Sequence, residues 1–210
     1  MRARWIWVAA VLLYAGFSWW YVGVRGPLTP DEIESHFARL ADSAEPRTAE
    51  QLQGLRRFLE EDDGREFFMV NLVRMHEGAV TAPGATSPAP AQEVLGNYTR
   101  HFMRALFWRA GHPAWFGRAV GRDLEQWEVP PNPGWSFAAA IRYRSRRDLI
   151  ELVNDPRFAG AHAFKRAAIE STFAFPAAPG FAVLGPRVWV GLVLALLAAL
   201  AHLGVRRRAG

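Results

Sequence analysis

The chain has 210 residues, half of them hydrophobic, with 25 Lys and Arg against 20 Asp and Glu and no Cys. Six of the basic residues lie outside segment 26–187 and all the acidic residues lie inside it, so this segment holds 19 basic residues and a formal charge of −1. The net positive charge belongs to the two ends of the chain, which argues against nucleic-acid binding. The absence of Cys excludes disulfides, Cys-ligated metal sites and Cys nucleophiles.

Two apolar segments predict membrane-spanning helices. Trp5–Val24 has 20 residues without a charge and carries tryptophans towards both ends, where the lipid–water interfaces would lie. A cleaved signal peptide is the alternative, but the segment is long for one and no Ala-x-Ala cleavage site follows. Val188–Val205 is the second candidate span, with His202 as its one ionisable residue, interpreted as a residue at the membrane boundary.

Arginines at both ends of the chain predict the topology. Short Arg-rich segments stay in the cytoplasm, so both termini are expected there and the middle of the chain outside it. The protein is therefore expected in the inner (plasma) membrane, with the lipid bilayer as a partner. The predicted organisation is an anchor at 1–25, a helical hairpin at 26–64, a folded domain at 65–180, and a second span with a basic tail at 181–210.

The hairpin is predicted from two helix starts. Thr29 is followed by Pro30 and Glu32, and Thr48 by Gln51, which are the patterns of a capping box. Both helices carry an apolar stripe. The stripes could pack on the folded domain or on the membrane surface, and the sequence does not choose.

The folded domain is predicted to start with a buried strand, Phe67–Val73, whose apolar run has charged residues on either side. A loop at Glu77–Pro90 and a helix at Gln92–Arg109, stopped by Gly111, come next. Strands are expected at Trp115–Val120 and Ser136–Tyr143, and Leu124–Val129 between them is a short strand or an extension. Helices at Ser145–Val153 and Arg157–Glu170 and a last strand at Thr172–Pro176 complete the domain. The order predicts an α+β fold, a ferredoxin-like βαββαβ antiparallel sheet with helices on one face. The other face must be covered, and a second copy of the chain is the simplest cover, so a homodimer is expected.

Several short segments carry a family resemblance. They are Phe68–Leu72 followed by Tyr98, Phe116–Gly121 followed by Trp127–Val129, Ile141–Arg146, Asp155–Phe158, and the run from His162 to Glu170. Together they resemble a ferredoxin-like domain of unknown function in the dimeric α+β barrel superfamily. The resemblance spans about residues 66–177 and leaves out both candidate spans and the hairpin. It implies the fold and dimerisation, and it implies no reaction.

Asn71 is the one polar side chain of the first strand. If Phe68, Val70 and Leu72 face the helices, Asn71 lies on the other side, where Arg118 and Arg142 could join it. One Asn and two Arg could bind a carboxylate or another anion through charge-assisted hydrogen bonds. The alternative is that these arginines form structural salt bridges with Glu125, Glu128 or Glu170.

Histidines supply the remaining candidates. His101 follows Tyr98 by three residues, so both could border one pocket, and a His can act as a general base. His162 is interpreted as a partly exposed polar residue of the last helix. No spacing of His and carboxylates predicts a metal site, and no motif predicts a cofactor.

Three functions from different classes remain open. The preferred one is a membrane-anchored domain outside the cytoplasm that binds or senses a small anionic or aromatic ligand through Asn71, Tyr98, His101, Arg118 and Arg142. The alternative is a cofactor-independent oxygenase or isomerase of the dimeric α+β barrel type that uses Asn71, His101 or Arg142. The third is a structural partner that assembles through its spans, with Ala195 and Ala199 as a small-residue pair.

Overall fold

The computed structural model describes residues 2–41, 47–122, 124–128, 134–156, 160–180 and 185–207. The chain forms two compact units: Met1–Arg25 together with Pro179–Gly210, and Gly26–Ala178. The first unit holds the two apolar helices, and the second holds the sheet and the remaining helices.

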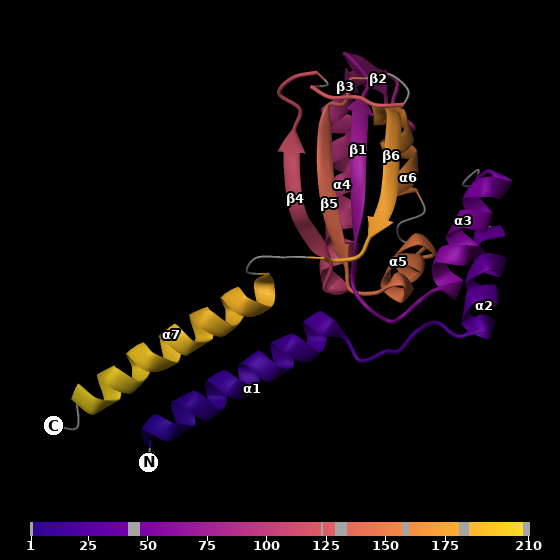
Figure 1. Cartoon of the computed structure of the whole chain (residues 1–210). Helices are drawn as coiled ribbons and strands as arrows, with labels where there is room; N and C mark the ends of the chain where they lie inside the picture. The colour runs from indigo at the N-terminus through magenta and orange to yellow at the C-terminus, as the bar shows by residue number, and fades with distance from the viewer. Residues whose placement is uncertain are drawn as a thin grey trace. The chain divides into compact units, whose positions relative to one another are not determined.

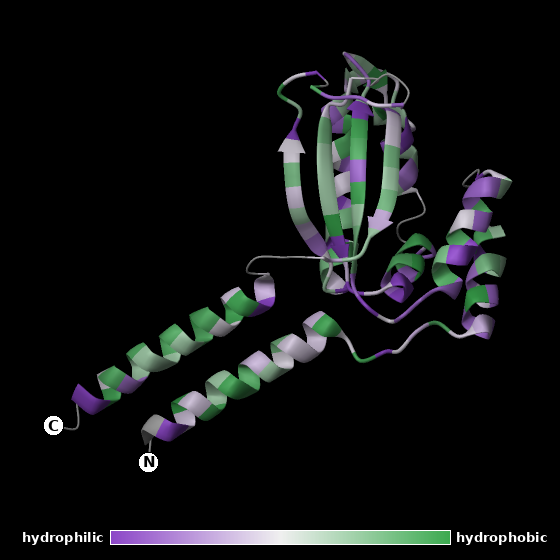
Figure 2. Cartoon of the chain, viewed as in Figure 1, coloured by the Kyte–Doolittle hydropathy of each residue, from purple (hydrophilic) through white to green (hydrophobic). Residues whose placement is uncertain are grey.

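The first unit is a pair of long helices, α1 (Arg2–Val22) and α7 (Pro186–Arg207), that lie side by side (Figure 1). Segments Arg4–Val22 and Pro186–Arg207 are long and apolar enough to cross a membrane, and only 6% of each apolar window is buried inside the structure. Figure 2 shows hydrophobic residues along most of both helices and hydrophilic residues where the arginines lie. Two helices with the properties of spans are therefore confirmed.

The two helices contact each other through specific side chains. A Cβ added at Gly191 would lie 3.2 Å from Cε2 of Tyr14, so α7 packs closely on that ring. Trp7 Nε1 donates a hydrogen bond to His202 Nδ1 over 3.2 Å. Ala198 is 4% exposed, whereas Ala195 is exposed. Within one chain, the close packing of α7 thus runs through Gly191 and Ala198. Assembly of several chains through Ala195 and Ala199 stays a prediction.

The second unit is built on a four-stranded antiparallel sheet in the order β4-β5-β1-β6. The strands are β1 (Phe67–Met75), β4 (His112–Arg118), β5 (Phe137–Tyr143) and β6 (Ile169–Ala177). Helices α4 (Ala91–Trp108) and α6 (Ala161–Ala168) cover one face of the sheet (Figure 1), and α5 (Arg146–Val153) follows β5. The α+β class, the antiparallel sheet and the predicted βαββαβ order are confirmed.

The orientation of β1 is the reverse of the prediction. Phe67 and Val73 are odd-numbered residues of the strand, so they lie on the same side of it. They are 5% and 4% exposed, and they face the helices. Asn71 lies on this same side, so the expectation that Phe68, Val70 and Leu72 face the helices is wrong. The physical reason is that β1 is apolar on both faces, so the alternation of its side chains does not indicate which face packs against the helices.

Other boundaries differ from the prediction locally. The loop predicted at 77–90 contains a small hairpin of β2 (Ala79–Thr81) and β3 (Pro88–Pro90). Strand β4 begins at His112, three residues earlier than expected. The described residues 124–128 form no strand, which leaves the extension as the alternative for Leu124–Val129, and 129 lies outside the described residues. The helix predicted at Arg157–Glu170 begins at Ala161 and is α6. Residues 157–159 lie outside the described residues.

Helix α4 ends where Gly111 was expected to stop it. Ala110 takes a positive φ of 55°, and the N–H of Gly111 donates to the carbonyl of Leu106 over 2.9 Å. This is the Schellman arrangement, which satisfies the last helical carbonyls. A Cβ at Gly111 would lie 2.3 Å from Cδ1 of Leu106, so the chain turns into β4 at a point where only Gly fits.

The predicted hairpin consists of α2 (Pro30–Ala41) and α3 (Ala49–Glu60), and both capping boxes form. Its apolar stripes pack on the sheet domain. Leu28, Ile33, Leu40 and Leu59 form one buried cluster with Ile150 of α5. The sequence did not decide whether these stripes pack on the domain or on the membrane surface. Their burial attaches the hairpin to the domain through the hydrophobic effect.

A buried arginine fixes the start of this unit. Arg147 on α5 is 6% exposed and donates to both carboxylate oxygens of Glu32 and, over 3.0 Å, to the carbonyl of Pro27. Leu28 N–H donates to Asp62 Oδ2 over 2.9 Å. The hydrogen bond from Arg147, followed by that from the Thr29 backbone, lowers the pKa of Glu32 to about 2.

Acid is predicted to weaken the ion pair between Arg147 and Glu32, here called the clamp. The folded pKa of Glu32 lies below the ordinary value of 4.5, so its contribution to stability is present above that value and is lost as pH falls towards 2. We expect the unfolding temperature of the full chain, followed by tryptophan fluorescence, to fall within this window. Glu32→Gln should lower it at neutral pH and flatten its pH dependence.

The matched control is Glu50→Gln, which removes an exposed carboxylate of α3. It should keep the wild-type pH dependence. If Glu32→Gln also kept that dependence, the clamp would not be the acid-sensitive element.

Candidate functional site

A cavity of about 790 Å³ lies between the sheet and the helices of the second unit. Strands β1, β4 and β5 form its floor, α4 forms the opposite wall, and residues of α5 and α6 close it. Small residues create the space, because Gly96 on α4 faces Ala139 and Ala174 on the sheet side. Ala139 and Ala174 are the two strand partners of Asn71, so the cavity centres on this residue.

The secondary structure explains which side chains reach the cavity. On α4, Leu95, Tyr98, Phe102 and their neighbours line the cavity because residues three and four apart share one helix face. On β4, Phe116 and Arg118 line it because they alternate with Gly117.

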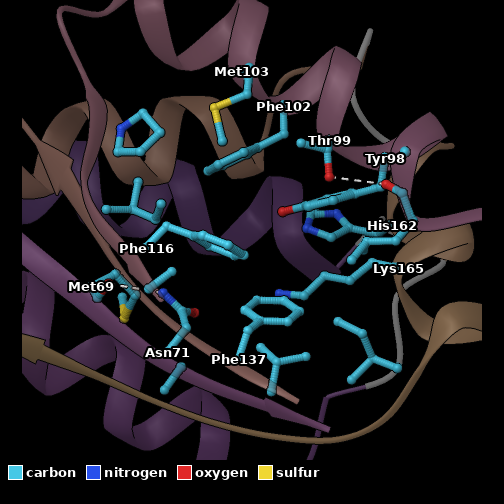
Figure 3. Close-up of a pocket in the computed structure, with 18 of the residues that line it drawn as sticks. Met69, Asn71, Tyr98, Thr99, Phe102, Met103, Phe116, Phe137, His162 and Lys165 are labelled. Carbon is cyan, nitrogen blue, oxygen red and sulfur yellow. Dashed lines mark hydrogen bonds between the residues drawn. The ribbon is translucent and has the colours of Figure 1, made fainter. Parts of the chain in front are cut away.

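Two pairs of aromatic rings form opposite walls. On α4, Tyr98 and Phe102 stack with ring centroids 5.4 Å apart and planes 12° from parallel. On the sheet side, Phe116 and Phe137 are 5.3 Å apart and tilted by 39°. Figure 3 shows the two pairs on either side of the cavity, with Met69 and Met103 further along its walls.

Polar groups meet in the middle of these walls. His162 lies with its ring centroid 5.5 Å from that of Tyr98, and Lys165 Nζ lies 5.5 Å from the same Tyr98 ring. Asn71 Nδ2 donates to the carbonyl of Met69 over 2.8 Å, which leaves Oδ1 on the cavity side (Figure 3). Lys165 extends from α6 into the space between Tyr98 and Phe137 (Figure 3).

The cavity is electrostatically positive. Arg118 and Lys165 line it, and none of its described lining residues is Asp or Glu. Burial raises the pKa of Tyr143, which also lines the cavity, so this phenol stays neutral at physiological pH. A bound molecule would meet apolar walls, a few neutral hydrogen-bonding groups and two cations.

Three of the five predicted site residues line the cavity: Asn71, Tyr98 and Arg118. Asn71 and Arg118 do share one face of the sheet, but it is the face that the helices cover. The predicted position of Asn71 on the open face is therefore corrected.

Arg142 and His101 lie elsewhere. Arg142 aligns with Phe68 on the opposite sheet face and is 2% exposed. It donates to Glu66 Oε2 over 2.5 Å and to the carbonyl of Ala110 over 2.6 Å, so it is a buried structural cation. His101 is exposed on α4, with Nδ1 2.8 Å from the carbonyl of Asn97.

Sequence reasoning missed His162 and Lys165 as cavity residues. They are one helical turn apart, so they share a face of α6. A further signal was available, because Lys165 is the only lysine of the chain, against 24 arginines. Among the described residues, no group of three or more His, Asp or Glu could hold a metal ion.

No protein-family model and no curated protein matches the chain significantly. Among solved structures, it is similar to RPA0582, a protein of unknown function from Rhodopseudomonas palustris. A crystal structure of the methylated protein gives a TM-score of 0.50, and a second crystal structure gives 0.49. In both, the sequence identity is 21% and the match covers 69% of this chain. It covers 97% of RPA0582 in the first structure and 98% in the second.

A third similar structure is a dimeric protein of unknown function with a ferredoxin-like fold from Bacteroides fragilis NCTC 9343. Its TM-score is 0.29, at 14% identity, over 53% of this chain and 93% of that protein. The likeness to RPA0582 is one of fold. Fold and site together define this chain as an α+β domain with a cavity between sheet and helices and two helices apolar enough to span a membrane.

Proposed function

We propose that the protein is a membrane-anchored ligand-binding domain, whose cavity takes up a small aromatic or anionic molecule on the outer side of the inner membrane. The observation that carries the proposal is the cavity itself. Its volume of about 790 Å³ lies in the range of ligand sites, ~300–1,000 Å³, and exceeds the voids of ordinary cores. Apolar walls with a few convergent polar groups are typical of such sites.

The membrane topology is part of the proposal. Arg2 and Arg4 lie at the start of α1, before its apolar part, and three arginines, Arg206 to Arg208, follow the apolar part of α7. Arg25 and Arg187 flank the spans on the other side and are outnumbered. The excess of positive charge favours cytoplasmic termini and, with two spans, a domain outside the cytoplasm.

We also propose that the domain forms a homodimer through the open sheet face. Trp115, Phe173 and Phe175 lie on this face and are 57%, 58% and 43% exposed. The strand register brings Trp115 and Phe175 into one row with Val70 and Ala140. A flat apolar face of this kind is stabilised when a second surface removes it from water.

The enzyme alternative keeps one supporting observation. Tyr98 and His162 lie side by side in the cavity, and both can exchange a proton with a bound molecule. Of the three residues named for that alternative, Asn71 lines the cavity, whereas His101 and Arg142 do not. Binding is therefore the function that the geometry supports best, and chemical conversion of a bound molecule would favour the enzyme.

A cavity-filling variant tests the ligand site. A Cβ at Gly96 meets no atom within 4 Å, so Gly96→Phe places a ring in the cavity without a backbone clash. We predict that the full chain in nanodiscs binds the fluorescent probe 6-cyano-2-methoxynaphthalene, with empty nanodiscs as background. Gly96→Phe should weaken this binding by about tenfold or more, since the ring competes for the apolar space.

The matched control is Gly54→Phe on α3, where the added Cβ also meets no atom within 4 Å. Both variants replace a helical glycine, so both remove the same backbone freedom from the unfolded chain. Equal binding by the two variants would contradict the cavity site.

A charge on the open face tests the dimer. Phe175→Glu would bring two carboxylates into one apolar interface, so we expect the full chain in detergent to change from two copies to one by light scattering. Phe107→Glu alters a comparably exposed ring on α4, 52% exposed, and should stay dimeric. A dimeric Phe175→Glu variant would exclude this face.

Reporter fusions test the topology. Alkaline phosphatase fused after Gly210 should be inactive, and green fluorescent protein at the same point should fluoresce, because the end of the chain is expected in the cytoplasm. Alkaline phosphatase fused after Pro179, before the second span, should be active. The reverse pattern would show that the domain faces the cytoplasm.

A further inference from the structure

We propose that the cavity binds an aromatic molecule through one ionised ring oxygen, a phenolate, with Lys165 as its counter-ion. This inference rests on the proposed ligand-binding function and adds the chemical class of the ligand. It follows from three observations: the aromatic walls, the position of Lys165 and the identity of that cation.

The walls favour a flat aromatic body. Tyr98 and Phe102 form a nearly parallel pair on α4, and Phe116 and Phe137 face them from the sheet (Figure 3). A planar ring between two aromatic surfaces gains stacking contacts in addition to apolar burial. A saturated or branched molecule would bury similar area without these contacts.

Lys165 supplies the charge at depth. Its side chain is half-buried, whereas that of Arg118, the other cation of the cavity, is exposed. The aliphatic stem of Lys165 carries Nζ over the face of the Tyr98 ring, 5.5 Å from its centroid. A ligand between the aromatic walls therefore meets Lys165, while Arg118 lies at the exposed side.

The identity of this cation decides between kinds of anion. The chain uses Arg at 24 of its 25 basic positions, and Lys165 is the exception. The planar fork of Arg matches the two oxygens of a carboxylate, whereas an ammonium is a compact point charge that suits a single oxygen. A phenolate carries its charge mainly on one oxygen, which suits the single point charge of Lys165.

Neighbouring groups suit the same oxygen. The hydroxyl of Tyr98 points into the cavity (Figure 3), and the ring of His162 lies beside it. The described lining contributes no carboxylate that would repel an anion. The ammonium therefore stabilises the ionised form of a bound phenol over its neutral form.

The test follows the ionisation of a bound phenol. The probe is 6-cyano-2-naphthol, added to the full chain in nanodiscs at the pH where half of it is ionised in buffer. Its absorption spectrum distinguishes phenol from phenolate. Binding to the wild-type chain should raise the ionised fraction of bound probe from half to about nine-tenths, the effect of one nearby cation.

Lys165→Met should reverse this enrichment, so that the bound probe becomes mainly neutral. The affinity of this variant for 6-cyano-2-methoxynaphthalene, which has no ionisable oxygen, should change far less than its affinity for the naphthol. The matched control is Arg166→Met, which removes the exposed cation of the next residue and should keep the enrichment. Lys165→Arg should retain part of it.

A second measurement does not depend on a variant. Reductive methylation with ¹³C-formaldehyde labels amines, and Lys165 is the only lysine of the chain. The NMR signal of its labelled methyl groups should shift when the naphthol is added and stay in place with the methoxy compound.

The outcomes separate this inference from the function on which it rests. Tight binding of both probes without phenolate enrichment would overturn the inference and leave the ligand-binding function intact. Tighter, Lys165-dependent binding of 2-naphthoate than of the naphthol would also overturn it, because the site would then be one for carboxylates. Binding of neither probe would contradict the inference and the proposed function together.

Discussion

The organisation of the domain depends on small residues at the contact between sheet and helix. Protein interiors are normally close-packed, but the small residues Gly96, Ala139 and Ala174 line this cavity, and a Cβ added at Gly96 would meet no atom within 4 Å. Phe67 and Val73 close the packing towards the two ends of β1, at 5% and 4% exposure. The sheet and α4 are therefore held apart around Asn71, and the cavity is a consequence of which side chains β1, β5 and β6 turn inward.

The surroundings of the cavity are fixed by polar contacts that leave the interior clear. Arg142 lies on the opposite face of the sheet. There it donates hydrogen bonds to Glu66 and to the carbonyl of Ala110, just after α4. Arg147 fastens Pro27 and Glu32 to α5, and the hairpin buries its stripes against Ile150. These buried cations are paired structurally, as buried charges must be. Lys165 lines the cavity, with Nζ over the Tyr98 ring.

The sequence predicts local structure where a short-range mechanism acts. The capping boxes at Thr29 and Thr48 and the helix stop at Gly111 each depend on residues within one turn, and all three form. The direction of β1 could not be predicted, because a strand with apolar side chains on both faces fits either way. That reversal placed Asn71 on the wrong face and grouped it with Arg142. His162 and Lys165 were missed because their role arises from packing of α6 against Tyr98, a contact between residues far apart in the chain.

The central claim is that the space around Asn71 holds a small aromatic molecule in the living cell. The most direct measurement is native mass spectrometry of the full chain released from nanodiscs made with its own membrane lipids. We predict a dimer of the chain that carries the added mass of a bound molecule. Collision should release this molecule as an aromatic compound with an ionisable oxygen. Chains that always emerge without added mass, or that carry lipid alone, would contradict it.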